Sequence, residues 1–227
     1  MTTEPVSGDD YLAFEAPALR ETPEEIEYEM RSAEGAMWTG GHLVIGIEAF
    51  FFASLAFAYF YLRSTNSQDL WRPNHITAPT SIGAAVFTLV LASALLNGYG
   101  TMRLRQGETL DWEVAGWVTV AGGLIALGLQ VWEYTKLSFF PGSSGYASCF
   151  VAWGVMNIAL LLAGLYWLET LLARWLRLRR AVVEDGGPAC STMPVARLFR
   201  ANLEGCWYFW AFIALVNLFF WVLFYVM

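Results

Sequence analysis

The stretch Leu43-Val-Ile-Gly-Ile-Glu-Ala-Phe-Phe-Phe-Ala-Ser-Leu-Ala-Phe-Ala-Tyr-Phe-Tyr-Leu62 decides the fold of this chain. The hydrocarbon core of a bilayer is about 30 Å thick, and a helix of about 20 apolar residues crosses it. The stretch therefore predicts a transmembrane helix. Glu48 is its only acidic or basic side chain, and a carboxyl group at that depth is costly unless it is protonated, paired or hydrogen-bonded. We expect Glu48 to face protein rather than lipid.

The composition of the whole chain is also that of a membrane protein. Of 227 residues, 57% are hydrophobic and 15% are charged, whereas soluble domains carry about 25% charged residues. The acidic charge is concentrated near the N-terminus, because ten of the 20 acidic residues but only two of the 13 basic ones precede Met37. We therefore expect residues 1–36 to be an acidic tail. The few, scattered basic residues argue against a nucleic-acid partner.

Five apolar segments predict an all-α fold, a polytopic membrane protein with a five-helix bundle in residues 37–227. We place the spans near residues 38–63, 79–101, 112–137, 145–175 and 203–227. Thr22-Pro-Glu-Glu25 has the pattern of a capping box and predicts a separate short helix near residues 23–34, ending at Gly35. Ten of the 13 basic residues fall on the N-terminal side of the membrane. The positive-inside rule therefore puts the N-terminus in the cytoplasm and the C-terminus outside.

Helical spacing predicts which faces of the spans meet protein. One face of the third span combines small residues, which let membrane helices approach closely, with two polar ones that we expect to point into protein: Ala115, Thr119, Gly122, Ala126, Gln130 and Glu133. The first span has two adjacent candidate faces, a small one with Gly46, Ala49, Ala53 and Ala56, and another with Glu48, Gly41, Phe52, Leu55 and Tyr59. One face would contact the chain's own bundle and the other another chain. Ordinary bundle packing explains the small-residue stripes but not the Glu48 face.

The two acidic groups inside the spans each allow two interpretations. Glu48 is either a protonated acid that donates one hydrogen bond to a neighbouring helix, or a group that tunes proton supply or gas access in a partner subunit. Glu133 lies one turn before Lys136, so we favour a structural ion pair between them over a proton site.

Residues for catalytic chemistry are few. The chain has two histidines, His42 and His75, and three widely spaced cysteines. A haem or copper centre needs several histidine, methionine or cysteine ligands on facing helices. The sequence also lacks a phosphate-binding loop and a nucleophile elbow. We therefore expect no metal site, no cofactor and no catalytic residue in this chain.

Several short motifs resemble subunit III of the haem-copper respiratory oxidases, the cytochrome c oxidase subunit III family, in a divergent five-helix form. They occur in the family's order from about residue 37 to residue 227: Glu48 with Phe50-Phe-Phe52 and Ala58-Tyr-Phe-Tyr-Leu-Arg63, then Trp71-Arg-Pro73, Gln130-Val-Trp-Glu-Tyr134 and Tyr146-Ala-Ser-Cys-Phe150. The residues that match the family's motifs are Glu48, Gln130, Glu133, Tyr134, Tyr146 and Ser148.

The sequence departs from the family pattern in its last two spans. Trp153-Gly-Val-Met-Asn-Ile-Ala-Leu160 stands where the family usually has a Thr-Gly and histidine-rich stretch. Trp207-Tyr-Phe-Trp-Ala-Phe212 keeps the aromatic character of the last helix but lacks the family's usual histidine and aspartate. Longer members also have two further N-terminal helices, where this chain has its acidic tail.

The resemblance implies a non-catalytic subunit of an oxidase that reduces oxygen to water and pumps protons, with haem and copper in partner subunits. It implies packing against subunits I and II, bound phospholipid, and support of complex stability and proton uptake, in a prokaryotic-type plasma membrane. Two alternatives stay open. One is an accessory subunit of a quinol oxidase or nitric oxide reductase, since the sequence does not identify the electron donor; the other is an independent transporter.

Overall fold

A computed structural model describes residues 22–66, 70–73, 76–187 and 194–227. These residues form α2 (Pro23–Ser64), α3 (Thr80–Arg105), α4 (Thr109–Tyr134), α5 (Gly145–Glu184), α6 (Pro194–Trp221) and a final π-helical turn, η2 (Val222–Val226), with no strand among them. All five long helices are long and apolar enough to cross a membrane, which confirms the all-α, five-span prediction. The predictions for residues 1–21 and for His75 and Cys190 fall outside the described residues.

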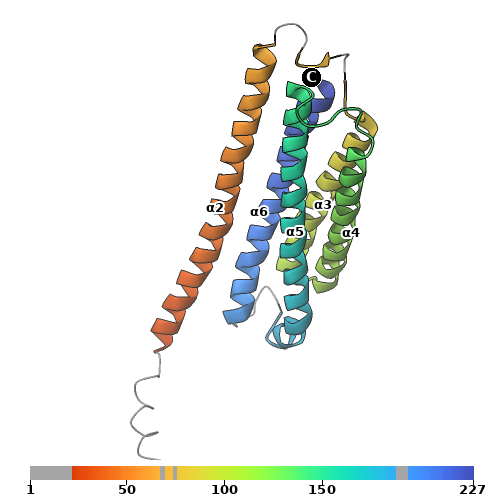
Figure 1. The fold of residues 1–227 in the computed structure, drawn as a ribbon. Coiled ribbons are helices and arrows are strands. Elements are labelled where there is room, and N and C mark those ends of the chain that lie inside the picture. The colour runs from red at the N-terminus through yellow and green to blue at the C-terminus, as the bar shows by residue number, and fades with distance from the viewer. Residues whose placement is uncertain (1–21, 67–69, 74–75, 188–193) are drawn as a thin grey trace, which may run out of the picture.

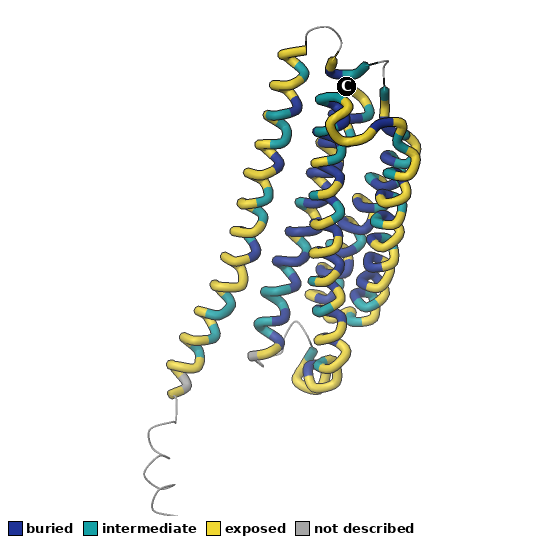
Figure 2. Tube along the Cα trace, in the orientation of Figure 1, coloured by how far each residue is buried: buried dark blue, intermediate teal, exposed yellow. Residues whose placement is uncertain are grey.

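The helices lie side by side, and α2 packs against both α6 and α5 (Figure 1). α6 contacts α2, α3 and α5, and α4 packs against α3 and α5. α2 is the most peripheral helix: only 17% of its most apolar window is buried, against 50% for α5 and α6. Its side away from the bundle is exposed along most of its length (Figure 2). The core therefore lies among α3 to α6, and α2 is attached to it along one face.

The helix that starts at Pro23 does not end at Gly35. The predicted capping box is present, because Thr22 Oγ1 accepts a hydrogen bond from the Glu25 amide at 3.2 Å and the Glu25 carboxylate accepts one from the Thr22 amide at 2.7 Å. The helix then continues without a break for 42 residues. A glycine ends a helix when it adopts a left-handed conformation, and Gly35 is not among the glycines with positive φ. The prediction of a separate short helix near residues 23–34 was wrong.

Two other helices extend further than predicted at the same end of the bundle. α5 runs past residue 175 to Glu184, and α6 begins at Pro194 rather than near residue 203. Buried apolar residues continue through both extensions, because Val182 is 3% exposed and Phe199 is 6% exposed. The Phe199 ring lies 5.6 Å from the Trp175 ring and 5.7 Å from the Trp112 ring. This aromatic cluster accounts for the additional helical turns.

Candidate functional site

Three amide side chains form a closed hydrogen-bonded group in the middle of the bundle. Gln130 of α4, Asn157 of α5 and Asn217 of α6 are each at most 2% exposed. Asn157 Nδ2 donates to Gln130 Oε1 at 2.7 Å and to Asn217 Oδ1 at 3.1 Å. Asn217 Nδ2 donates back to Asn157 Oδ1 at 2.8 Å and to the Ile213 carbonyl at 2.9 Å. The hydrogen bonds within this amide triad offset the cost of burying polar groups among apolar helices.

The sequence predicts that Gln130 points into protein, but it assigns no site role to Asn157 or Asn217. Both asparagines are buried amides in otherwise apolar spans. A polar side chain within an apolar span is the sequence signal for such a site. Their pairing could not be read from the sequence, because they are 60 residues apart and on different helices.

Glu133 lies beside the amide triad, toward the end of α4. It is 3% exposed and accepts a hydrogen bond from the Tyr225 hydroxyl at 2.6 Å. The expected ion pair with Lys136 is not present; Lys136 Nζ instead lies 5.5 Å from the centre of the Trp132 ring. The reason is that α4 ends at Tyr134, so Lys136 follows the end of the helix while Glu133 stays on its inward face. The face predicted for α4 does point into protein, from Ala115 to Glu133.

Tyr134, next to Glu133, also forms a hydrogen bond between α4 and α5. Its hydroxyl donates to the Val151 carbonyl at 3.4 Å, and Gln130 Nε2 donates to the Gly154 carbonyl at 3.5 Å. A methyl group at Gly154 would overlap the Tyr134 hydroxyl. Glycine is therefore required at 154 for the two helices to approach this closely. Gln130, Glu133 and Tyr134, which the sequence grouped in one motif, lie together in the structure.

Tyr146 and Ser148 lie apart from these residues, at the start of α5. The Tyr146 hydroxyl donates to the Phe224 carbonyl at 3.0 Å and accepts from the Ala78 amide at 3.3 Å. The Arg72 guanidinium lies 4.2 Å from the centre of the Tyr146 ring and donates to the same Phe224 carbonyl at 3.1 Å. Ser148 Oγ donates to the Ser144 carbonyl and accepts from the Gly142 amide. Tyr146 thus holds η2, whereas Ser148 stabilises a local turn.

The face of α2 that carries Glu48 packs against α6. A Cβ at Gly41 would lie 3.6 Å from the Gly205 Cα, and the Phe52 ring lies 5.6 Å from the Phe220 ring. Farther along the same face, the Tyr59 hydroxyl donates to the Leu223 carbonyl at 2.7 Å. The other candidate face is exposed at Gly46, Ala49 and Ala53. The interpretation that ordinary bundle packing accounts for the small-residue face but not for the Glu48 face was wrong.

Glu48 itself is half-buried beside this contact. Its Oε2 atom is buried and has no hydrogen-bond partner in the described part of the chain. The expected hydrogen bond to a neighbouring helix is therefore not formed by this oxygen. A buried carboxyl oxygen without a hydrogen-bond partner is costly, because polar groups inside apolar surroundings are normally paired.

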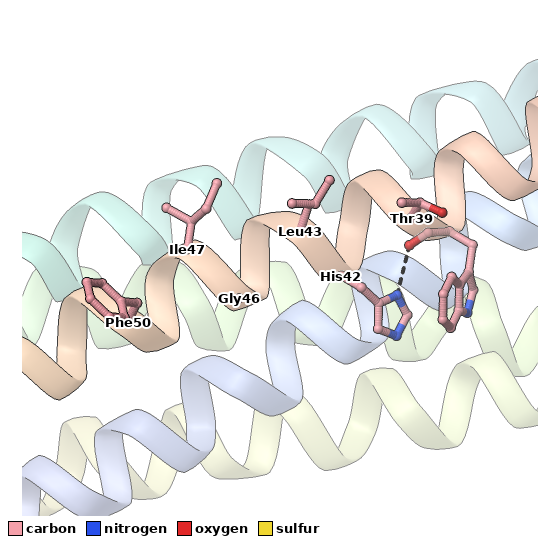
Figure 3. A pocket seen from close by; sticks show the side chains of 7 residues that line it. Thr39, His42, Leu43, Gly46, Ile47 and Phe50 are labelled. Carbon is pink, nitrogen blue, oxygen red and sulfur yellow. Dashed lines mark hydrogen bonds between the residues drawn. The ribbon is translucent and has the colours of Figure 1, made fainter.

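Two apolar grooves mark the outer surface of the bundle. One, of about 580 Å³, lies along α2 between Trp38 and Phe50, with Gly46 at its floor (Figure 3). His42 is one of its lining residues; its Nδ1 lies 2.8 Å from the carbonyl oxygen of Trp38, which can only accept a hydrogen bond. The second groove, of about 510 Å³, lies between α3 and α6, next to Trp207. Among the described residues, no three His, Cys, Asp or Glu side chains gather as metal ligands.

Comparison with known proteins points to one class of membrane complex. No family model matches the chain. A segment of 103 residues, 45% of the chain, is 26% identical to cytochrome c oxidase subunit 3 of Thermostichus vulcanus and covers 50% of that protein. The chain thus spans about half the length of the curated relative that it matches. With its five candidate membrane spans, it is an integral membrane protein similar to an oxidase subunit.

Proposed function

We propose that this chain is a non-catalytic subunit of a membrane haem-copper oxidase complex, of the subunit III type. The observation that carries the proposal is the similarity to a cytochrome c oxidase subunit 3 in a chain of five membrane-spanning helices. The complex would reduce oxygen to water with proton pumping. This chain would pack on its catalytic subunit and stabilise it during turnover.

The geometry of the motif residues supports a structural role. Gln130, Glu133 and Tyr134 form hydrogen bonds with α5 and η2, and Tyr146 forms one with η2. Side chains whose polar atoms are all engaged inside a bundle fix its shape. We propose that these residues set the relative positions of α4, α5 and α6. The shape of the surface that would contact the catalytic subunit depends on those positions.

Glu48 has a different place in the proposal. Its face is turned toward α6, and one carboxyl oxygen is left without a partner. We propose that Glu48 acts as part of the contact between α2 and α6. Its effect on proton supply or gas access in the partner would then be exerted through that contact.

The redox centres belong to other chains in this proposal. Haem and copper would be held by subunits I and II, and this chain would contribute no ligand. The apolar grooves on α2 and between α3 and α6 support contact with phospholipid acyl chains. The N-terminus would be cytoplasmic and the C-terminus outside, in a prokaryotic-type plasma membrane.

The test is to extract native membranes in mild detergent and to pull on a tag at the N-terminus. The optical spectrum and the co-purifying chains are then recorded. We expect haem absorbance and a histidine-rich, many-helix partner. The haem type and the partner's electron-entry domain distinguish a cytochrome c oxidase from a quinol oxidase or a nitric oxide reductase. A colourless, solitary five-helix protein would refute the proposal and favour an independent transporter.

A further inference from the structure

The first part of α2 is attached to the bundle in an unusual way. None of the side chains described in residues 24–40 is buried, and the first buried residue of the helix is Gly41. This part of the helix leans away from the other helices (Figure 1). We call residues 23–40 the arm. Because the arm buries no apolar side chain, the hydrophobic packing that holds the rest of α2 does not hold it.

Arg197 of α6 holds the arm by ion pairs. Its Nε and Nη2 atoms lie 2.8 and 2.9 Å from the two carboxyl oxygens of Glu34, a bidentate arrangement. Its Nη1 atom lies 2.6 Å from Glu27 Oε2. The arginine side chain is only 21% exposed, and two-point pairing of this kind gives a defined geometry rather than a loose contact. A single cation thus joins two turns of the arm to α6.

The helix next to this attachment is rich in glycine. Gly35, Gly40, Gly41 and Gly46 fall within 12 residues, and glycine is the poorest helix former after proline. Gly41 faces α6: a Cβ there would lie 3.6 Å from the Gly205 Cα, an ordinary van der Waals contact. A Cβ at Gly35, Gly40 or Gly46 would meet nothing within 4 Å. These three glycines are not required by packing, and they make this part of α2 easy to bend.

We propose that the arm is a latched lever, which pivots near Gly40 and is held in place by Arg197. When the latch is closed, the arm continues the axis of α2. When the ion pairs open, the arm swings about the Gly41–Gly205 crossing. Glu48 lies two turns from Gly41 on the same face, so movement of the arm acts on the α2–α6 contact beside which the carboxyl group lies. The proposal concerns the fold of this chain and does not depend on which complex it joins.

The test measures the position of the arm directly. Spin labels are attached through unnatural amino acids at Tyr28 and Leu110, which are 74% and 69% exposed, in the full chain in lipid nanodiscs. Distances between them are read by pulsed electron resonance. Tyr28 lies 12 residues from Gly40, or about 18 Å along a helix, so a bend of about 20° moves it by about 6 Å.

We expect one narrow distance distribution for the native chain. Arg197→Gln should broaden it and shift it by up to about 6 Å. The exchange Arg197→Glu with Glu34→Arg and Glu27→Gln should restore a narrow distribution, because it rebuilds the pair at position 34 with reversed charges and removes the carboxylate that would repel the new one. Arg31→Gln is the matched control: Arg31 pairs with Glu27 inside the arm, so its removal should leave the distribution unchanged.

A second comparison tests the pivot. Gly35→Ala with Gly40→Ala adds no clash and should narrow the distribution of the Arg197→Gln chain. A distribution that stays narrow in Arg197→Gln alone would overturn the latch. A broad distance distribution in the native chain would also overturn the latch. Broadening that the alanine substitutions leave unchanged would overturn the glycine pivot.

Discussion

Replacing one member of the amide triad should destabilise the bundle more than replacing all three. Asn157→Leu keeps a similar side-chain volume but removes three hydrogen bonds, of 2.7, 3.1 and 2.8 Å. It leaves Gln130 Oε1, Asn217 Oδ1 and one Asn217 N–H buried without partners. Hydrogen bonds inside membrane bundles contribute about 0.6 kcal/mol each on average, and an orphaned buried polar group costs about 1–3 kcal/mol. Three lost hydrogen bonds at this average give about 2 kcal/mol, and three orphaned groups at the low end of their penalty give about 3 kcal/mol, so we expect a loss of at least about 2–3 kcal/mol in the free energy of unfolding.

The triple change Gln130→Leu, Asn157→Leu and Asn217→Leu removes the partners together and leaves no orphaned amide. Its loss should be below about 1.5 kcal/mol, because replacing a complete buried polar group by apolar side chains of similar shape is nearly neutral. The assay is reversible unfolding of the purified chain in mixed micelles, followed by tryptophan fluorescence. If the triple variant loses as much unfolding free energy as the three single variants together, the interpretation that the three amides satisfy one another's hydrogen bonds is refuted.

Three further results are expected. Gly154→Ala should cost about 1–3 kcal/mol in unfolding free energy through overlap with the tyrosine hydroxyl of α4, whereas Gly128→Ala, which meets nothing within 4 Å, should be neutral or stabilising in the same assay. Tyr225→Phe should cost about 1–3 kcal/mol, because it leaves Glu133 buried without its 2.6 Å donor; an unchanged melting temperature would contradict this. Glu48→Gln should leave assembly with partner chains intact, whereas Glu48→Ala should weaken co-purification or shorten the active lifetime under turnover. Unchanged assembly and lifetime in Glu48→Ala would make the carboxyl group a bystander.

The inward face of α4 could be predicted because its signal is local. Ala115, Thr119 and Ala126 are small and fall at helical spacing with Gln130 and Glu133, so one face was marked without knowledge of the neighbouring helices. The partner of Glu133 could not be predicted in this way. Tyr225 is 92 residues away, while Lys136 is close in sequence and has the opposite charge. Nearness in the chain favoured the wrong partner.

The two faces of α2 show a different limit. Both combine small and apolar residues, so the sequence of α2 alone does not decide which one meets the bundle. The decision comes from α6, where Gly205 accepts the close approach of Gly41 and Phe220 meets Phe52. Similarly, Gly35 could end a helix or continue it, and the outcome depends on its backbone conformation rather than on its identity.

The π-helical turn η2 has a consequence for how the chain is made. The carbonyls of Leu223 and Phe224 receive hydrogen bonds from Tyr59, Tyr146 and Arg72, which belong to three earlier segments. Each of these donors is synthesised before η2, so its hydrogen bond to η2 forms only after the end of the chain has been made. Insertion and final closure are therefore separate steps of biogenesis. A nascent chain stopped before residue 222 would contain α2 to α6 but would lack the carbonyls to which Tyr59, Tyr146 and Arg72 donate.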